Sequence, residues 1–179
     1  MSEEEFGILA GYCEIKQFAK GEVLNRPGEV CDWLSLINEG ILRYYHAVNG
    51  KEHIGEIFFK GQMVTDYCSY TLQTGSMIYI DVVKDCELVI IKKSDMEHLK
   101  QTMPGILKFI AAYLAMNYIS NFQRNTSLLM DSAETRYLNL LRDRPEVVRQ
   151  VPLYMVASYL GITPEALSRT RHKIAHTGG

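Results

Sequence analysis

The sequence predicts an α+β protein in which an antiparallel β-barrel or jelly roll precedes a long helix and a C-terminal helix-turn-helix. Three observations carry this prediction. Short β-rich runs alternate with turn residues from Tyr12 to about Lys92. A largely apolar helical stretch begins at Pro104, and residues 151–174 hold two short helical patterns joined by a glycine. We expect three units: a barrel over 1–102, a connecting helix over 103–130 and a helix-turn-helix domain over 131–179.

Residues 3–10 form a predicted leading helix, and the β-rich part follows it. Its turn signals recur about every eight to twelve residues, which is typical of a small antiparallel barrel or sandwich. Asn49-Gly50 is the clearest hairpin signal, because both residues tolerate positive φ. We place strands at five runs: Trp33–Ile37, Ile41–Val48, His53–Phe59, Met77–Val83 and Glu87–Lys92.

Helix resumes at Ser94, and a long helix is predicted over residues 104–129, with Pro104 in its first turn. The first half of this helix is apolar on nearly every side, so it needs partners on more than one face. We expect one face to cover the barrel and the other to join a second copy of the chain in a homodimer. Burial inside one monomer is the alternative. Two shorter helices follow, one around Tyr137–Leu141 and one over Glu146–Gln150.

The stretch from Leu153 to Ile174 has the spacing of a helix-turn-helix. Apolar residues recur at i, i+3, i+4 and i+7 between Leu153 and Leu160, which gives the first helix one apolar stripe. Gly161 can adopt the left-handed turn, Thr163 is a good N-cap, and Pro164 fits the first helical position. A plain helical hairpin with a solvated polar face is the alternative.

The polar face of the second helix is the candidate reader of DNA bases. Arg169 can bond a guanine edge in bidentate fashion, and Glu165 can accept from a cytosine amino group one turn away. Ser168 lies between them and can contact a base or a phosphate. The backbone phosphates, which supply affinity rather than sequence choice, are assigned to four residues: Thr163, Arg171, His172 and Lys173.

Charge is distributed unevenly along the chain, although its net value is only −2. Residues 132–179 hold seven Lys and Arg against four Asp and Glu, whereas residues 1–131 hold 12 against 17. This asymmetry is expected if only the C-terminal part meets phosphate. The beginning of the chain, Met1–Glu5, is acidic where a secretory signal would be basic, and no run is apolar enough to span a membrane. We therefore expect a cytoplasmic protein without a membrane partner.

Metal and cofactor signals are weak. The four cysteines are far apart and form no C-x-x-C pair, so zinc and iron–sulfur sites are not expected. His46, His53 and Glu56 are candidate metal ligands if the barrel is a cupin-like enzyme, but no closely spaced histidine pair supports them. No nucleophile triad, phosphate loop or dinucleotide fingerprint occurs either. We predict no bound metal and no enzyme activity.

The order of barrel, long helix and helix-turn-helix resembles the Crp/Fnr family of bacterial transcription regulators over almost the whole chain. Three features are similar to the family's cyclic-nucleotide-binding-type barrel: Lys20-Gly21-Glu22 with Gly28-Glu29, the run Ile37–Arg43, and the Asn49-Gly50 hairpin. Glu165-x-x-Ser168-Arg169 is similar to the recognition motif of the Fnr branch, whose members read TTGAT-like half-sites in an inverted repeat. The resemblance implies double-stranded DNA as ligand, a homodimer paired through residues 104–129, and RNA polymerase as a further partner.

One departure from the family concerns cyclic AMP. Members that bind it carry a Gly-Glu pair and, further on, an Arg-Ser or Arg-Thr pair that hold the ribose and the phosphate. Here no basic residue lies between Lys60 and Lys84, so a buried phosphate would lack a countercharge. We expect no cyclic AMP in the usual mode and no cofactor; any effector is a different ligand. The residues assigned to such a pocket are Asp66, Tyr67, Ser69, Ser76 and Tyr79, with ordinary surface and hairpin positions as the alternative.

Two further departures are a missing cysteine cluster of the Fnr type and a missing wing. Most relatives follow the recognition helix with a β-hairpin that touches the DNA backbone, and too few residues follow Ile174 here to form it. We expect fewer phosphate contacts and a flatter salt dependence. The leading prediction is a dimeric, sequence-specific transcription regulator. The alternatives are a cupin-like metal enzyme and a regulatory subunit whose helical tail does not bind DNA.

Overall fold

A six-stranded antiparallel sheet forms the β-domain of the chain, over residues 14–92. The computed structural model describes residues 2–177. The central path of the sheet runs β1-β6-β3-β4, with β2 paired to β6 and β5 paired to β3. The strands are β1 (Glu14–Phe18), β2 (Val23–Asn25), β3 (Trp33–Val48), β4 (Lys51–Phe58), β5 (Met63–Val64) and β6 (Tyr79–Lys92). The antiparallel jelly-roll type of β-domain is therefore confirmed.

Two pairs of predicted strands are in fact continuous strands. The runs 33–37 and 41–48 are joined in β3, and the runs 77–83 and 87–92 are joined in β6. The residues between the first two predicted strands, Asn38-Glu39-Gly40, form a bulge, because the register of β3 against β6 shifts on both sides of Glu39. Gly40 has φ +100°, and a Cβ there would lie 2.3 Å from Cys86 Cβ. The glycine thus marks a close approach of two strands and not a chain reversal.

The Asn49-Gly50 hairpin is confirmed. Both residues have positive φ, 51° and 74°, and they join β3 directly to β4. Three short strands were not predicted, namely β1, β2 and β5, since each is too short or too irregular to show a period of two. A short helix, α2 (Tyr67–Leu72), was also not predicted.

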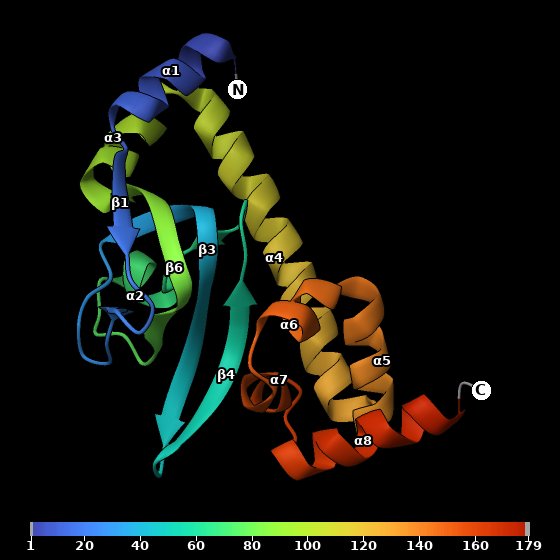
Figure 1. Cartoon of the computed structure of the whole chain (residues 1–179). Helices are drawn as coiled ribbons and strands as arrows, with labels where there is room; N and C mark the ends of the chain where they lie inside the picture. Colours follow the sequence, from blue (N-terminus) through green and yellow to red (C-terminus); the bar gives the residue numbers. More distant parts are fainter. Residues whose placement is uncertain (1, 178–179) are drawn as a thin grey trace.

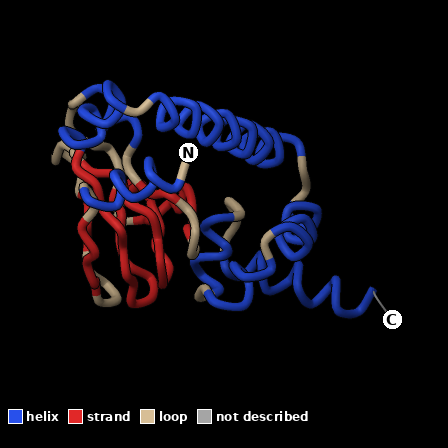
Figure 2. The backbone as a smooth tube through the Cα atoms, turned by 90° about the horizontal axis from the view of Figure 1, so that it is seen from above, coloured by secondary structure: helices blue, strands red, loops and turns tan. Residues whose placement is uncertain are grey.

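Helices flank the β-domain at both ends of the chain (Figure 1). They are α1 (Glu3–Gly11), α3 (Lys93–Thr102), α4 (Pro104–Met130), α5 (Ala133–Asp143), α6 (Pro145–Gln150), α7 (Leu153–Tyr159) and α8 (Pro164–Thr177). The predicted positions of the leading helix, the long helix and the C-terminal helices are confirmed. α4 runs from beside α1 and α3 to the C-terminal helices, as both views show (Figures 1 and 2). No helix within residues 2–177 qualifies as a membrane span.

The apolar interior consists of three clusters. One fills the β-domain and is built on Leu42, Ile80 and Leu88. A second lies where α3 meets the start of α4 and includes Leu99 and Ile106. The third crosses from the sheet to the C-terminal helices. It joins the β-domain residues Ile41, Tyr45, Ile54, Ile57 and Val83 to residues of α5–α8 and the segments between them.

Alternation along β3 explains why the sheet contributes to two of these clusters. Leu42 points into the β-domain, whereas Arg43 and Tyr45 belong to the opposite face. Arg43 is 5% exposed and donates to both carboxylate oxygens of Asp81, its register partner on β6, at 2.7 and 2.8 Å. The guanidinium carbon lies 4.3 Å from the ring centre of Tyr45. The outer face of the sheet is therefore a packed surface for the C-terminal helices.

Candidate nucleic-acid interface

α7 and α8 form the predicted helix-turn-helix geometry. α7 ends at Tyr159, Gly161 adopts φ +67°, and α8 begins at Pro164. The hydroxyl of Thr163 accepts a hydrogen bond from the Ala166 N–H at 3.2 Å, so Thr163 is the N-cap that the sequence indicated. The left-handed Gly161, the Thr163 cap and Pro164 at the start of α8 thus define the turn, and each suits the conformation at its position.

The inner faces of the two helices are anchored in the third apolar cluster. Val156 and Ala157 on α7 are fully buried, and Leu167 on α8 is 1% exposed. Ile174 packs at the edge of the same cluster, about two helical turns further along α8. Because Leu167 holds α8 inward, the residues on the opposite side of the helix must face outward.

The three residues predicted to read bases are all exposed on that outward side. Glu165, Ser168 and Arg169 lie in the first turns of α8, and Ser168 and Arg169 line a shallow hollow on its surface. The pKa of the Glu165 carboxyl lies below its usual value, because its own backbone N–H and the Thr163 side chain donate to it and Arg169 attracts it. Glu165 is therefore ionised at neutral pH and acts as an acceptor.

The residues predicted to contact phosphates have mixed surroundings. Arg171 is exposed, and Thr163 is occupied as the helix cap. Lys173 forms an ion pair with Glu134 of α5 at 2.5 Å, which ties α8 to the helix behind it. His172 lines the hollow on α8 and stacks on His176, with ring centres 4.0 Å apart.

The residues assigned to an effector pocket have structural partners in the chain. Asp66 caps α2 by accepting from the N–H groups of Cys68 and Ser69, at 3.1 and 3.2 Å. The Ser69 hydroxyl donates to Thr74 O at 2.6 Å and accepts from Cys31 N. Tyr67 begins α2 and is 47% exposed. These three residues therefore come together around one short helix.

Ser76 and Tyr79 have other neighbours. The Ser76 hydroxyl accepts from Asn25 Nδ2 at 2.8 Å and donates to Ile78 O at 3.0 Å. Tyr79 stacks on Tyr45, with ring centres 5.0 Å apart, beside the cluster shared with the C-terminal helices. Ser76 thus joins the end of β2 to the segment that precedes β6, and Tyr79 lies on the packed outer face of the sheet.

The candidate metal ligands do not gather into a site. His46 and His53 are register partners across the β3–β4 hairpin, and both are exposed. The Glu56 carboxylate accepts from Arg144 instead. Within residues 2–177, no three His, Cys, Asp or Glu side chains lie close enough to share a metal ion.

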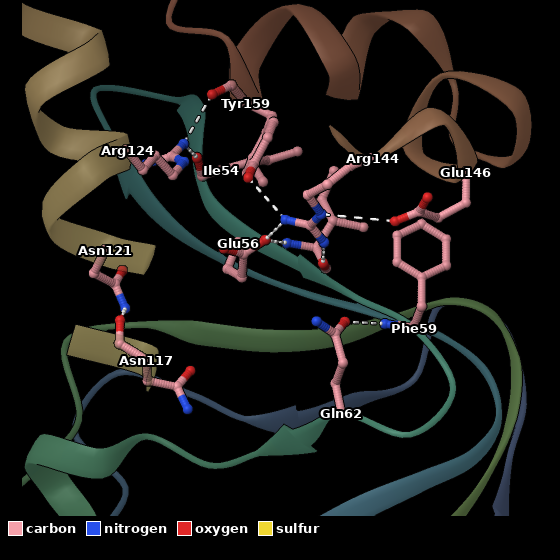
Figure 3. A network of polar contacts seen from close by, with 11 residues as sticks. Ile54, Glu56, Phe59, Gln62, Asn117, Asn121, Arg124, Arg144, Glu146 and Tyr159 are labelled. Carbon is pink, nitrogen blue, oxygen red and sulfur yellow. Dashed lines mark hydrogen bonds and ion pairs between the residues drawn. The ribbon is translucent and has the colours of Figure 1, made fainter. Parts of the chain in front are cut away.

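A polar network between β4 and the C-terminal helices was not predicted from the sequence (Figure 3). Arg144, between α5 and α6, donates to the Glu56 carboxylate, to Ile57 O and to the Tyr159 hydroxyl. The pKa of Arg144 is raised: burial is the largest single effect and lowers it, but the interactions with Glu56 and Tyr159 together outweigh burial. Burial raises the pKa of the Tyr159 phenol, so its hydroxyl stays protonated at neutral pH. Residues so distant in sequence leave no periodic signal that could predict such a contact.

Comparison with known proteins agrees with this architecture. Residues 15–103 match the cyclic nucleotide-binding domain. The c-di-GMP responsive global regulator CLP of Xanthomonas campestris superposes with a TM-score of 0.79 at 18% identity, over 99% of this chain and 93% of that one. FixK2 of Bradyrhizobium japonicum gives 0.79 at 17% identity, over 93% and 86%. A structure from Eubacterium rectale described as a transcriptional regulator of the Crp/Fnr family gives 0.74 at 17% identity, over 99% and 85%.

No curated protein matches the chain. The residues matched to the domain model run from β1 to the beginning of α4, and the superpositions extend over α4–α8 as well. Residues 15–103 are therefore similar to the cyclic nucleotide-binding domain, and the chain has the fold of the Crp/Fnr regulator from Eubacterium rectale.

Proposed function

We propose that the chain is a sequence-specific DNA-binding transcription regulator and that α8 is its recognition helix. The observation that carries this proposal is the two-sided character of α8. Leu167 is buried against α7, while Glu165, Ser168 and Arg169 are exposed together on the first turns. A recognition helix places its N-terminal residues against base edges in the major groove. An acceptor and a bidentate donor one turn apart are the groups that such reading requires.

The proposed active species is a homodimer joined through α4. Eight large apolar residues on this one helix are more than one-third exposed: Leu107, Phe109, Met116, Tyr118, Ile119, Phe122, Leu129 and Met130. Phe122 is 62% exposed and lies on the side of α4 opposite Tyr113, whose hydroxyl donates to Met63 O of the β-domain. So much apolar surface on one element favours a protein partner. A second copy is the partner that an inverted repeat of DNA half-sites requires.

We also propose that cyclic AMP is not the effector. Asp66 Oδ1 and the Ser69 hydroxyl, at the start of α2, are already hydrogen-bonded within the chain. No lysine or arginine lies between β5 and β6 to receive a phosphate. Titration of the protein with cyclic AMP in a calorimeter is expected to give no heat of binding. RNA polymerase remains the proposed further partner, on the strength of the regulator fold alone.

Selection of bound sequences from a random duplex pool tests this function. The purified chain is expected to enrich an inverted repeat at low salt, and the same repeat more weakly at near-physiological salt. Charge reversal of the readers, as Glu165→Lys with Arg169→Glu, keeps the helix exposed and is expected to abolish the enrichment. Enrichment of nothing by the wild-type chain, or of the same repeat by the reversed variant, contradicts the assignment of α8.

A further inference from the structure

β4 is the outer strand of the sheet path, and its free edge faces the C-terminal helices. An edge strand presents a row of unpaired N–H and C=O groups, which usually must be blocked or covered. Here five of these groups are bonded to side chains. The side chains are those of Ser158 on α7, Arg124 on α4, Arg144 between α5 and α6, and Glu56 on β4 itself.

Ser158 of α7 provides the first pair of contacts. Its hydroxyl accepts from the Ile54 N–H at 3.0 Å and donates to Glu52 O at 2.9 Å. One side chain thus satisfies a donor and an acceptor of the edge, as a neighbouring strand would. Ser158 lies more than 100 residues from both partners in the chain, so this contact is entirely tertiary.

Two arginines cap the remaining carbonyl groups. Arg124 of α4 donates to Ile54 O at 3.3 Å and to Tyr159 O at 2.8 Å, so one guanidinium joins β4 to the end of α7. Arg144 donates to Ile57 O, and the Glu56 carboxylate held by Arg144 accepts from the Ile57 N–H at 2.8 Å. Tyr159 lies against both arginines, with Arg124 Cζ 4.4 Å from its ring centre (Figure 3).

Apolar burial reinforces the polar contacts. Ile54 and Ile57 of β4 are 4% and 0% exposed, and they share one cluster with Val156 and Tyr159 of α7. The first helix of the helix-turn-helix is therefore fixed to the β-domain by packing and by the two Ser158 contacts, and Arg124 and Arg144 each join the edge of β4 to Tyr159. A flexible tether between two independent domains would leave this strand edge in water.

We propose that the edge of β4 is a docking surface for α7 and that it sets the orientation of the recognition helix. Ser158, Arg124 and Arg144 are its positioning residues. This inference rests on the proposed function. In a dimer, two recognition helices must meet half-sites about one DNA turn apart. This docking surface holds α7 in one position on each β-domain. It therefore also sets the separation of the two α8 helices in the dimer. It governs which half-site spacing is bound, whereas Glu165 and Arg169 govern which bases are read.

Ser158→Ala is the variant of choice, because it removes two edge contacts and leaves the arginine network intact. Glu56→Gln is the second variant, and it weakens Arg144 from the strand side. Arg142→Gln is the matched control, since Arg142 is near Arg144 but is exposed and pairs with its neighbour Asp143. All four proteins, including the wild type, are compared at a temperature where circular dichroism shows them folded.

The first readout needs no DNA. Hydrogen exchange of the Ile54 amide is expected to accelerate about tenfold in Ser158→Ala. Exchange of Ile54 is expected to be unchanged in Arg142→Gln. Unchanged exchange of the Ile54 amide in Ser158→Ala overturns the proposal that the edge of β4 is a docking surface, whatever the protein does with DNA.

The second readout uses duplexes that carry the selected inverted repeat with its native spacing, with spacers longer or shorter by one and two base pairs, and as a single half-site. If the edge of β4 orients the recognition helices, Ser158→Ala and Glu56→Gln are expected to lose about tenfold in affinity for the native spacing. Both variants are expected to bind a single half-site as the wild type does. Their preference among spacers is expected to flatten. An unchanged spacer profile together with faster exchange makes the edge contacts merely structural and overturns the inference. Tighter binding by either variant overturns it as well.

Failure of the proposed function gives a different pattern. In that case the wild-type chain binds no duplex in preference to a scrambled one, while the exchange result still reports on the edge of β4. The two proposals are thus separated by the wild-type titration alone.

Discussion

Arg144 and Glu56 lie 88 residues apart in the sequence, and their ion pair joins the end of α5 to strand β4. Both side chains are only about one-fifth exposed, at 22% and 19%. Arg144 also donates to the Tyr159 hydroxyl at 2.8 Å, so the same guanidinium reaches the last residue of α7. One charged group therefore links the β-domain to the helix that precedes the proposed recognition helix.

Arg144→Ala is expected to lower the free energy of unfolding by about 2–3 kcal/mol, because it leaves the largely buried Glu56 carboxylate and Ile57 O without the arginine that bonds both. Arg142→Ala, two residues earlier, removes an exposed arginine and is expected to cause no measurable change. Urea denaturation followed by circular dichroism measures both. Equal midpoints for Arg144→Ala and the wild type would show that the network adds no stability.

Gly55→Ala is expected to destabilise the chain by about 1–3 kcal/mol through overpacking. A Cβ at position 55 would lie 1.8 Å from the Tyr44 ring, at the point where the β3–β4 register shifts. Gly7→Ala in α1 is the control, since nothing lies within 4 Å of its Cβ, and alanine favours helix by up to about 1 kcal/mol. Thermal melts of the two variants should therefore move in opposite directions, and a melt of Gly55→Ala at the wild-type temperature refutes the steric argument.

Tyr70→Phe is expected to leave stability at neutral pH unchanged or to raise it. The Tyr70 hydroxyl is buried and has no hydrogen-bond partner within residues 2–177, so its removal costs no bond. Burial raises the pKa of this phenol from 10.0 to about 12. A raised pKa means that the folded chain favours the neutral phenol. The contribution of the neutral Tyr70 phenol to the free energy of unfolding is therefore complete below pH 10 and is lost as the pH rises toward 12.

Denaturation midpoints at pH 8 and pH 11 test this pair of expectations. The wild type should lose more stability than Tyr70→Phe between the two values. A parallel loss in both proteins would show that Tyr70 does not report the alkaline transition, and a large loss in Tyr70→Phe at pH 8 would reveal a partner for its hydroxyl.

Phe122→Glu is expected to raise the dissociation constant of the homodimer at least about tenfold. It places a charge in the exposed apolar face of α4, where Phe122 is 62% exposed. Gln101→Glu adds the same charge on α3 and serves as the control. Sedimentation velocity over a concentration series measures the shift. Identical profiles for both variants and the wild type would place the dimer contact elsewhere or remove it.

Local signals predicted most of the helical elements. The apolar period from Leu153 to Leu160 and the Gly161 turn were sufficient to predict α7, and Thr163 marked the start of α8. Strand continuity was not predictable in the same way. Gly40 interrupts the sequence pattern like a turn, but in the structure it forms a bulge that keeps β3 intact.

In the proposed site, too, local features were predictable from the sequence and contacts between distant segments were not. Exposure of Glu165, Ser168 and Arg169 followed from helical period, because Leu167 fixes the buried side. The contacts of Arg144 and Ser158 with β4 could not be predicted, since they depend on how two distant segments pack. The β3–β4 bulge and the burial of Ile54 and Ile57 create that surface only after folding.

The most direct test of the central proposal compares sequence selection by the wild type with selection by Arg169→Ala. The account predicts that the wild type enriches an inverted repeat and that Arg169→Ala enriches the same repeat with preference lost at one position in each arm. The loss should be worth about 1–3 kcal/mol of discrimination at that base pair. An unaltered preference at every position, or no enrichment by the wild type, would contradict the assignment of α8 as a reader of DNA.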